Sequence, residues 1–137
     1  MDETDLKILK LLEKNSRASN TEIAAKIKAS EGTVRKRISD LTGKKIIRRF
    51  TIDIGTNTGF NAFVLIKTEP NVILSKTIKR IQLIHGIKKV SEIAGGFDLI
   101  VEITTESSEK FNEIIDLIRK LPKIENTQSL IVLKTSF

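Results

Sequence analysis

Residues 19–41 constrain the fold of this chain more than any other stretch, because they predict two short capped helices joined by a tight turn. Ser19 and Glu22 have the spacing of a capping box, and apolar residues follow at helical intervals, so a helix is expected over residues 20–28. Ser30 is a suitable N-cap for a second helix. This arrangement is typical of a helix-turn-helix, whose second helix enters the major groove of DNA.

The second helix is expected to bury one apolar stripe and to expose the rest of its surface. The inward residues are Val34, Ile38 and Leu41, which recur at helical spacing. The outward residues are then Glu31, Thr33, Arg35, Lys36 and Ser39. A preceding helix over residues 2–15 is expected to complete the small core with Leu6, Leu9 and Leu12.

Positive charge is concentrated in the first third of the chain. Residues 1–50 carry 13 Lys or Arg and 7 Asp or Glu, whereas residues 51–137 carry 11 and 10. A basic surface favours DNA, because each neutralised phosphate releases condensed counterions. A solvated helix face is the alternative interpretation. The residues expected to contact DNA are Ser30, Glu31, Thr33, Arg35, Lys36, Arg37, Ser39, Lys44, Lys45, Arg48 and Arg49.

Composition excludes several other classes of protein. No apolar run approaches the ~20 residues of a membrane-spanning helix, and no signal-peptide pattern is present, so a cytoplasmic protein without membrane contact is expected. The chain has no Cys, which removes disulfides, thiolate chemistry and zinc fingers. Its single histidine, His85, cannot build a multi-histidine metal site and is interpreted as a surface residue at a helix end. We therefore expect no metal and no cofactor.

After residue 60 the pattern changes to strands that alternate with helices. Strands are predicted over residues 61–69, 87–93, 97–104 and 124–134, with one helix after Pro70 and a second helix that has Ser108 as its N-cap and ends before Pro122. The order β-α-β-β-α-β is the split βαβ arrangement, a four-stranded sheet with both helices on one face. The predicted fold class is therefore α+β, with an N-terminal helix-turn-helix domain and a C-terminal ferredoxin-like domain.

The other face of this sheet is also expected to be covered. Over residues 62–66 and 130–133 both alternating sets of side chains are apolar, whereas a sheet with one solvated face alternates apolar and polar residues. No third layer of this chain is available to cover that face. A second copy of the chain is the expected cover, which gives a symmetric dimer that presents two recognition helices to DNA.

The chain as a whole resembles the Lrp/AsnC, or feast/famine, family of transcription regulators. The motifs that carry the resemblance are Asp2-x-x-Asp5, Ser30-x-x-x-Val34-x-x-Arg37-Ile38-x-x-Leu41, Ile46-Ile47-Arg48-Arg49-Phe50, Gly96-Phe97-Asp98 and Thr127-x-Ser129. The resemblance implies a helix-turn-helix domain over residues 1–45, a basic strand linker over 46–60 and a ferredoxin-like domain of the RAM type over 61–137. It also implies dimers that assemble into tetramers or octamers and bind a small amino acid between them.

The effector site that the resemblance implies lies at the turn between the second and third strands. Its residues are Ile93, Ala94, Gly95, Gly96, Phe97 and Asp98, with further contacts from Thr127 and Ser129 of the last strand. The chemistry fits, because Gly95 and Gly96 allow close backbone approach to an α-carboxylate and Asp98 can accept from an α-ammonium. The alternative is that the two glycines only form a tight hairpin and that Asp98 only caps it.

Two departures from the family pattern have physical consequences. Lys28 stands at a turn position that is usually Gly, and a left-handed conformation there costs ~1 kcal/mol. Ser129 replaces the second Thr of the last-strand motif, which keeps the hydroxyl but alters the pocket. Two rival functions remain open at this point. One is a porphyrin decarboxylase of similar fold, and the other is a non-specific architectural DNA-binding protein.

Overall fold

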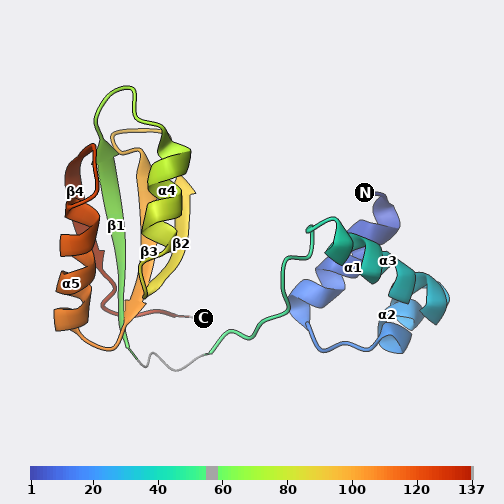
Figure 1. Ribbon diagram of the computed structural model, residues 1–137. Helices are drawn as coiled ribbons and strands as arrows, with labels where there is room; N and C mark the ends of the chain where they lie inside the picture. The colour runs from blue at the N-terminus through green and yellow to red at the C-terminus, as the bar shows by residue number, and fades with distance from the viewer. Residues whose placement is uncertain (55–58, 137) are drawn as a thin grey trace. The chain divides into compact units, whose positions relative to one another are not determined.

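A computed structural model of the chain describes residues 1–54 and 59–136 (Figure 1). The chain divides into two compact units, Met1–Ile54 and Gly55–Phe137. Residues 55–58 of the expected linker lie outside the described residues, as does residue 137 at the end of the expected C-terminal domain. Among the described helices, none combines the length and the apolar character needed to cross a bilayer.

The first unit contains three helices, α1 (Glu3–Lys14), α2 (Asn20–Ile27) and α3 (Glu31–Gly43). Side chains define where each helix begins. Ser19 and Glu22 form the expected capping box of α2, and Ser30 accepts a hydrogen bond from the Thr33 amide at the start of α3. A second capping box, between Asp2 and Asp5, begins α1. These contacts satisfy backbone N–H groups that have no partner inside a helix.

Residues from all three helices form the core of the first unit. Its buried members are Ile8, Leu12, Ile23, Ala24, Val34, Leu41 and Ile47. The expected role of Leu6 is wrong, because its side chain is 45% exposed, while Ile8 is fully buried. The reason is helical phase. Leu6 lies two residues before Ile8, and at about 100° per residue this places it on the opposite side of α1.

The turn between α2 and α3 depends on one left-handed residue. Lys28, the C-cap of α2, has φ 56° and ψ 49°. The Ala29 amide donates to the Ala24 carbonyl at 3.0 Å, which closes the end of the helix. A lysine therefore adopts the conformation that a glycine would adopt without a steric penalty.

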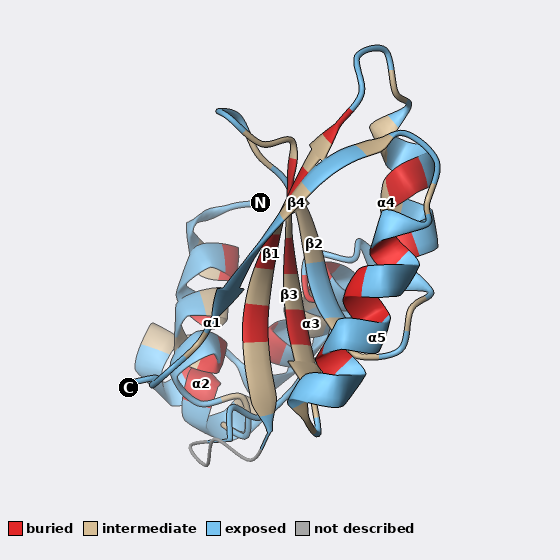
Figure 2. Cartoon of the chain, turned by 90° about the vertical axis from the view of Figure 1, so that its left-hand side faces the viewer, coloured by how far each residue is buried: buried red, intermediate tan, exposed pale blue. Residues whose placement is uncertain are grey.

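The second unit contains a four-stranded sheet and two helices. The strands are β1 (Phe60–Thr68), β2 (Ile87–Glu92), β3 (Leu99–Thr105) and β4 (Ile124–Ile131), in the spatial order β2-β3-β1-β4 with antiparallel neighbours. The helices are α4 (Leu74–Gln82) and α5 (Ser108–Arg119). Both lie along one side of the sheet, with their buried residues turned towards it (Figure 2). This is the expected split βαβ arrangement.

Several boundaries in this unit differ from the sequence prediction: β3 begins at Leu99 and not at residue 97, and the helix expected after Pro70 begins at Leu74. Ser107 rather than Ser108 is the N-cap of α5, because its hydroxyl accepts from the Lys110 amide. The last strand ends at Ile131 and not at residue 134. Val132 continues the pairing through one hydrogen bond from its amide to the Asn61 carbonyl, at 2.9 Å.

The two faces of the sheet have different environments. Alternate residues of β1 and β3, among them Val64, Ile66 and Val101, are fully buried beneath the helices together with Phe111 and Ile118 of α5. The opposite face carries Phe63, Leu65, Ile100 and Leu130, as the strand register places Phe63 beside Leu130 and Leu65 beside Ile100. These four side chains are exposed or half-buried. An apolar set therefore occupies the face that the helices leave open.

Candidate DNA interface and effector site

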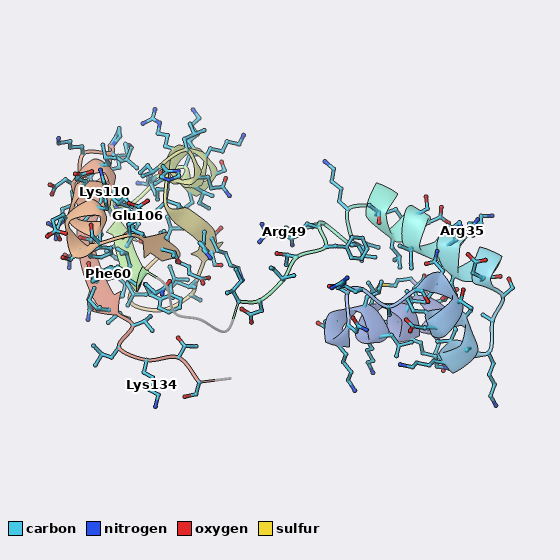
Figure 3. All side chains as sticks on the ribbon, turned by 90° about the horizontal axis from the view of Figure 1, so that it is seen from below. Arg35, Arg49, Phe60, Glu106, Lys110 and Lys134 are labelled. Atoms are coloured by element: carbon cyan, nitrogen blue, oxygen red, sulfur yellow. The ribbon has the colours of Figure 1, made fainter. Side chains whose placement is uncertain are left out.

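The outward face of α3 carries cationic and hydroxyl side chains. Arg35, Lys36 and Ser39 are exposed, opposite the stripe formed by Val34 and Leu41. Arg35 lies on α3, and its guanidinium pairs with Glu31 one turn earlier (Figure 3). Both partners of this pair are exposed, so it contributes only a few tenths of a kcal/mol and a stronger partner can replace it. This face can therefore offer donors to base edges or phosphates.

The first turn of α3 is organised by two hydroxyl groups. The Ser30 hydroxyl accepts from the Thr33 amide at 3.1 Å and lies 2.7 Å from the Thr33 hydroxyl. These contacts hold Ser30 in a capping role. Both residues are exposed at the positive end of the helix dipole, where an anion such as a phosphate is stabilised.

Arg37 lies on a different side of α3 from Arg35 and Ser39, and on the flank that also carries Thr33. It follows Val34 by three residues and precedes Leu41 by four, which places it beside the buried stripe. Its Nη1 atom donates to Asp2 Oδ2 and, at 3.1 Å, to Asp5 Oδ1. The guanidinium is thus bound within the first unit, to the residues that cap α1.

The segment after α3 is basic and packs against the first unit through Ile47. Ile47 is buried in the core of the first unit, and its amide donates to the Leu41 carbonyl at 3.1 Å. Ile46 is exposed, so one of the two isoleucines provides the anchor. The neighbouring cations Lys44, Lys45, Arg48 and Arg49 are exposed, with Arg49 labelled in Figure 3. Residues 48–54 form no strand in this single chain.

The predicted effector turn connects β2 to β3. The Ile93 amide donates to the Asp98 carbonyl at 2.9 Å, which closes the turn. Gly95 has φ 135°, a conformation that favours glycine, and a Cβ atom on Gly95 or Gly96 would meet nothing within 4 Å. Phe97 is half-buried and Ala94 is exposed. The backbone at both glycines is therefore open to approach.

Asp98 binds the end of strand β1. Its Oδ2 atom accepts from the Thr68 amide at 2.8 Å and from the Thr68 hydroxyl at 2.9 Å. Lys67 Nζ lies 3.8 Å from the same oxygen. The bond from the Thr68 amide is the main cause that lowers the pKa of Asp98, followed by the Thr68 hydroxyl. An α-ammonium group would have to bind the other carboxylate oxygen, Oδ1.

Thr127 and Ser129 lie on the far side of β1 from this turn. Thr127 pairs in register with Ile66, and Ser129 with Val64, so both belong to the face that the helices cover. The Thr127 hydroxyl accepts from Arg119 Nε at 3.1 Å, at the end of α5. Thr127 and Asp98 therefore occupy the same end of the sheet but are separated by β1. A single chain does not bring them into contact.

Three contacts at these sites involve partners that sequence reasoning missed. They are Asp2 and Asp5 with Arg37, Thr68 with Asp98, and Arg119 with Thr127. A signal was present for Arg37, because its spacing from Val34 and Leu41 places it beside the core stripe and not on the outward face. The Thr68–Asp98 pair depends on how β1 and β3 align, and the Arg119–Thr127 pair on how the end of α5 packs against β4, neither of which the sequence pattern defines.

Each of the two units matches a domain of known proteins. Residues 1–42 match the AsnC-type helix-turn-helix domain, and residues 61–137 match the Lrp/AsnC ligand binding domain. The chain is 39% identical to the HTH-type transcriptional regulator LysM of Sulfurisphaera tokodaii, over 100% of this chain and 98% of that protein.

Solved structures share the fold. PH0061 has a TM-score of 0.90 at 26% identity, over 100% of this chain and 95% of that one. The L-Met complex of the transcriptional regulator NMB0573 from Neisseria meningitidis has a TM-score of 0.79 at 21% identity, over 98% and 90%. The chain belongs to the Lrp/AsnC family of transcriptional regulators, with a DNA-binding helix-turn-helix domain followed by a ligand-binding domain.

Proposed function

We propose that α3 reads DNA sequence with Arg35, while Lys36 and the basic residues that follow α3 bind phosphates. The observation that supports this most strongly is the exposed face of α3, where two cations and the Ser39 hydroxyl lie opposite the buried stripe. Among the described residues Arg35 pairs with the exposed Glu31 alone, so its guanidinium is available for bidentate bonding to a guanine edge. Lys36 carries a point charge suited to phosphate.

The test compares two duplexes of equal length, one selected from a random pool by the wild-type chain and one unselected. Arg35→Ala is expected to lose about 1–3 kcal/mol at one base position of the selected duplex. Lys36→Ala is expected to weaken both duplexes alike and to lower the slope of log K against log salt by about 0.9. Equal losses on both duplexes for Arg35→Ala would contradict base recognition by that residue.

We propose further that the ligand-binding domain responds to a small amino acid at the β2–β3 turn. The open backbone at Gly95 and Gly96 supports this, because neighbouring N–H groups can bind a carboxylate. The L-Met complex of NMB0573 supports an amino acid as the class of ligand. Thr127 and Ser129 would complete the site from a neighbouring copy, since β1 separates them from the turn within one chain.

A thermal-shift screen of the twenty amino acids tests this proposal. A ligand present at 100 times its Kd should stabilise the protein by about 2.7 kcal/mol, which raises the melting temperature measurably. Gly96→Val fills the open approach without the positive φ of Gly95, and it should abolish the shift. A shift that persists in Gly96→Val would place the ligand elsewhere.

We also propose that the chain acts as a dimer through the open face of its sheet. Phe63, Leu65, Ile100 and Leu130 gather on that face, and the described part of the chain supplies no layer over them. A second copy buries this set and brings two α3 helices to one DNA duplex, as a symmetric site requires.

A further inference from the structure

The carboxylates of Asp2 and Asp5 form a closed hydrogen-bond network with Arg37. Asp2 Oδ1 accepts from the Asp5 amide at 2.9 Å, and Asp5 Oδ2 accepts from the Asp2 amide at 3.1 Å. The two remaining oxygens, Asp2 Oδ2 and Asp5 Oδ1, both accept from Arg37 Nη1. One nitrogen of α3 thus joins the residues that begin α1, although they lie 35 and 32 positions away in sequence.

This network is partly removed from solvent. Asp5 is only 8% exposed, and it is the one charged residue among the buried side chains of the described chain. A buried carboxylate is costly without a partner, and Arg37 supplies that partner. The pKa of Asp2 is lowered, chiefly by the Asp5 amide and next by Arg37. Both carboxylates therefore oppose the removal of Arg37 from this position.

A phosphate is a poor ligand for Arg37 in this setting. A DNA backbone that approached the guanidinium would meet two carboxylates that already bind it, and like charges repel at such distances. Arg35 meets a smaller obstacle, since its one ion pair is with the exposed Glu31, and no ion pair holds Lys36 among the described residues. Arg37 is therefore the least suited of the three consecutive cations to bind DNA.

The network lies on a flank of α3 that close packing does not fill. A surface cavity of about 460 Å³ opens there, lined by Asp5, Arg37, Asp40 and Leu41 among others. The apolar contacts of Val34 and Leu41 resist large rotations about the helix axis, because these would expose the stripe, but they are non-directional and define small rotations less sharply. Hydrogen bonds are directional, and those from Arg37 to α1 oppose such rotation.

Building on the proposed reading of DNA by α3, we propose that Arg37 is a positioning residue that sets the rotation of the recognition helix through Asp2 and Asp5. The Arg37 guanidinium binds these two carboxylates and does not bind DNA. Base contacts need a defined rotation of α3, whereas non-specific phosphate contacts tolerate several. Loss of the network should therefore weaken specific binding more than non-specific binding.

The test uses the direction in which DNA affinity changes when a carboxylate is removed. Removing a carboxylate near a DNA-binding surface normally strengthens binding, because it removes repulsion from phosphates. Asp2→Asn keeps an effective N-cap for α1 but weakens the bond to Arg37. A positioning role predicts that Asp2→Asn weakens binding despite the loss of a negative charge. Glu3→Gln is the matched control, since Glu3 lies in the same turn and pairs only at the surface with Lys7, at 2.7 Å.

Kd is measured for the full chain on the selected and unselected duplexes at several salt concentrations, with circular dichroism to confirm folding. Asp2→Asn and Arg37→Gln should each lose roughly fivefold or more on the selected duplex, the cost of one misplaced base contact. The unselected duplex and the salt slope should be nearly unchanged. Glu3→Gln should bind as the wild type or more tightly. If Arg37→Gln does not fold, Asp2→Asn carries the test.

Two results would overturn the positioning role alone. A salt slope lowered by about 0.9 in Arg37→Gln, with tighter binding by Asp2→Asn, would make Arg37 a phosphate contact. Unchanged binding in both variants would leave the network without a role in recognition. If the wild-type chain itself showed no preference for the selected duplex, the proposed reading of DNA would fail and the positioning role with it, whereas either of the first two results leaves that reading intact.

Discussion

At the residue scale, Lys28 lowers the stability of the first unit because its backbone is left-handed. Its left-handed conformation is unfavourable for a residue with a Cβ atom. Lys28→Gly should raise the free energy of unfolding by about 0.5–1 kcal/mol, because the relieved strain exceeds the added entropy of the unfolded chain. Urea unfolding followed by circular dichroism measures the change. Lys26→Gly, inside α2, is the control and should lower stability by about 0.5–1 kcal/mol. If Lys28→Gly and Lys26→Gly lowered stability by equal amounts, the left-handed conformation of Lys28 would carry no strain.

The carboxylate of Asp98 makes the second unit sensitive to acid. Its pKa is lowered in the folded chain, chiefly by the Thr68 amide, so it binds fewer protons folded than unfolded near that pKa. This contribution is complete above the ordinary Asp pKa of about 3.9 and is lost as pH falls through the lowered value. Asp98→Asn should destabilise the protein at pH 6 and have a smaller effect at pH 2. Urea unfolding at both values measures this, with the exposed Glu92→Gln as control. If Asp98→Asn lowered stability equally at pH 6 and pH 2, the charge of Asp98 would not contribute to stability.

At the scale of elements, the segment after α3 is proposed to bind phosphates beside the helix. Arg48 and Arg49 are exposed one and two residues after the buried Ile47, which fixes where they emerge from the first unit. Changing both to Gln should lower the slope of log K against log salt by about 2, at ~0.9 per phosphate. Filter binding over a salt series measures the slope. Changing Lys76 and Lys79 of α4 to Gln is the matched control and should leave it unchanged. An unaltered slope in the Arg48 and Arg49 variant would exclude this segment from the interface.

The elements themselves were largely predictable, because local chemistry determines them. The Ser19–Glu22 capping box, the stripe on α3 and the strand-helix order follow from spacing of a few residues, and the structure has them. Prediction was less reliable where two nearby residues of the same type could take the same structural role. Ser107 and Ser108 are adjacent candidates for one cap, and Leu6 and Ile8 are both apolar, so only the realised phase of each helix selects between them.

Much of the candidate site was named from sequence, but its internal partners were not. The binding of Asp98 to Thr68 and of Arg37 to Asp5 joins residues 30 and 32 positions apart. Such pairs follow from packing and register, which one sequence pattern leaves open. Charge and motif alone therefore assign Arg37 to DNA, whereas the fold supplies it with carboxylate partners.

At the scale of the whole molecule, the open face of the sheet determines the expected state of assembly. Leu130, at 43% exposure, lies beside Phe63 on that face. Leu130→Glu would place a charge in an apolar interface and should convert the dimer to a monomer. Light scattering after gel filtration measures the mass. Leu83→Glu is the control, because Leu83 is 87% exposed at the end of α4 in the helical layer. A wild-type monomer, or a Leu130→Glu dimer, would contradict this interface.

The attachment of the β2–β3 turn to β1 has a consequence for amide hydrogen exchange. The Asp98 amide donates to the Ile66 carbonyl, and the Thr68 amide donates to the Asp98 carboxylate. Neither proton can exchange with solvent until the turn separates from the central strand, so both report the same local opening. A ligand seated on the turn would slow exchange at Thr68 without touching it. The exchange rate of the Thr68 amide therefore measures whether a ligand occupies the proposed site at the β2–β3 turn.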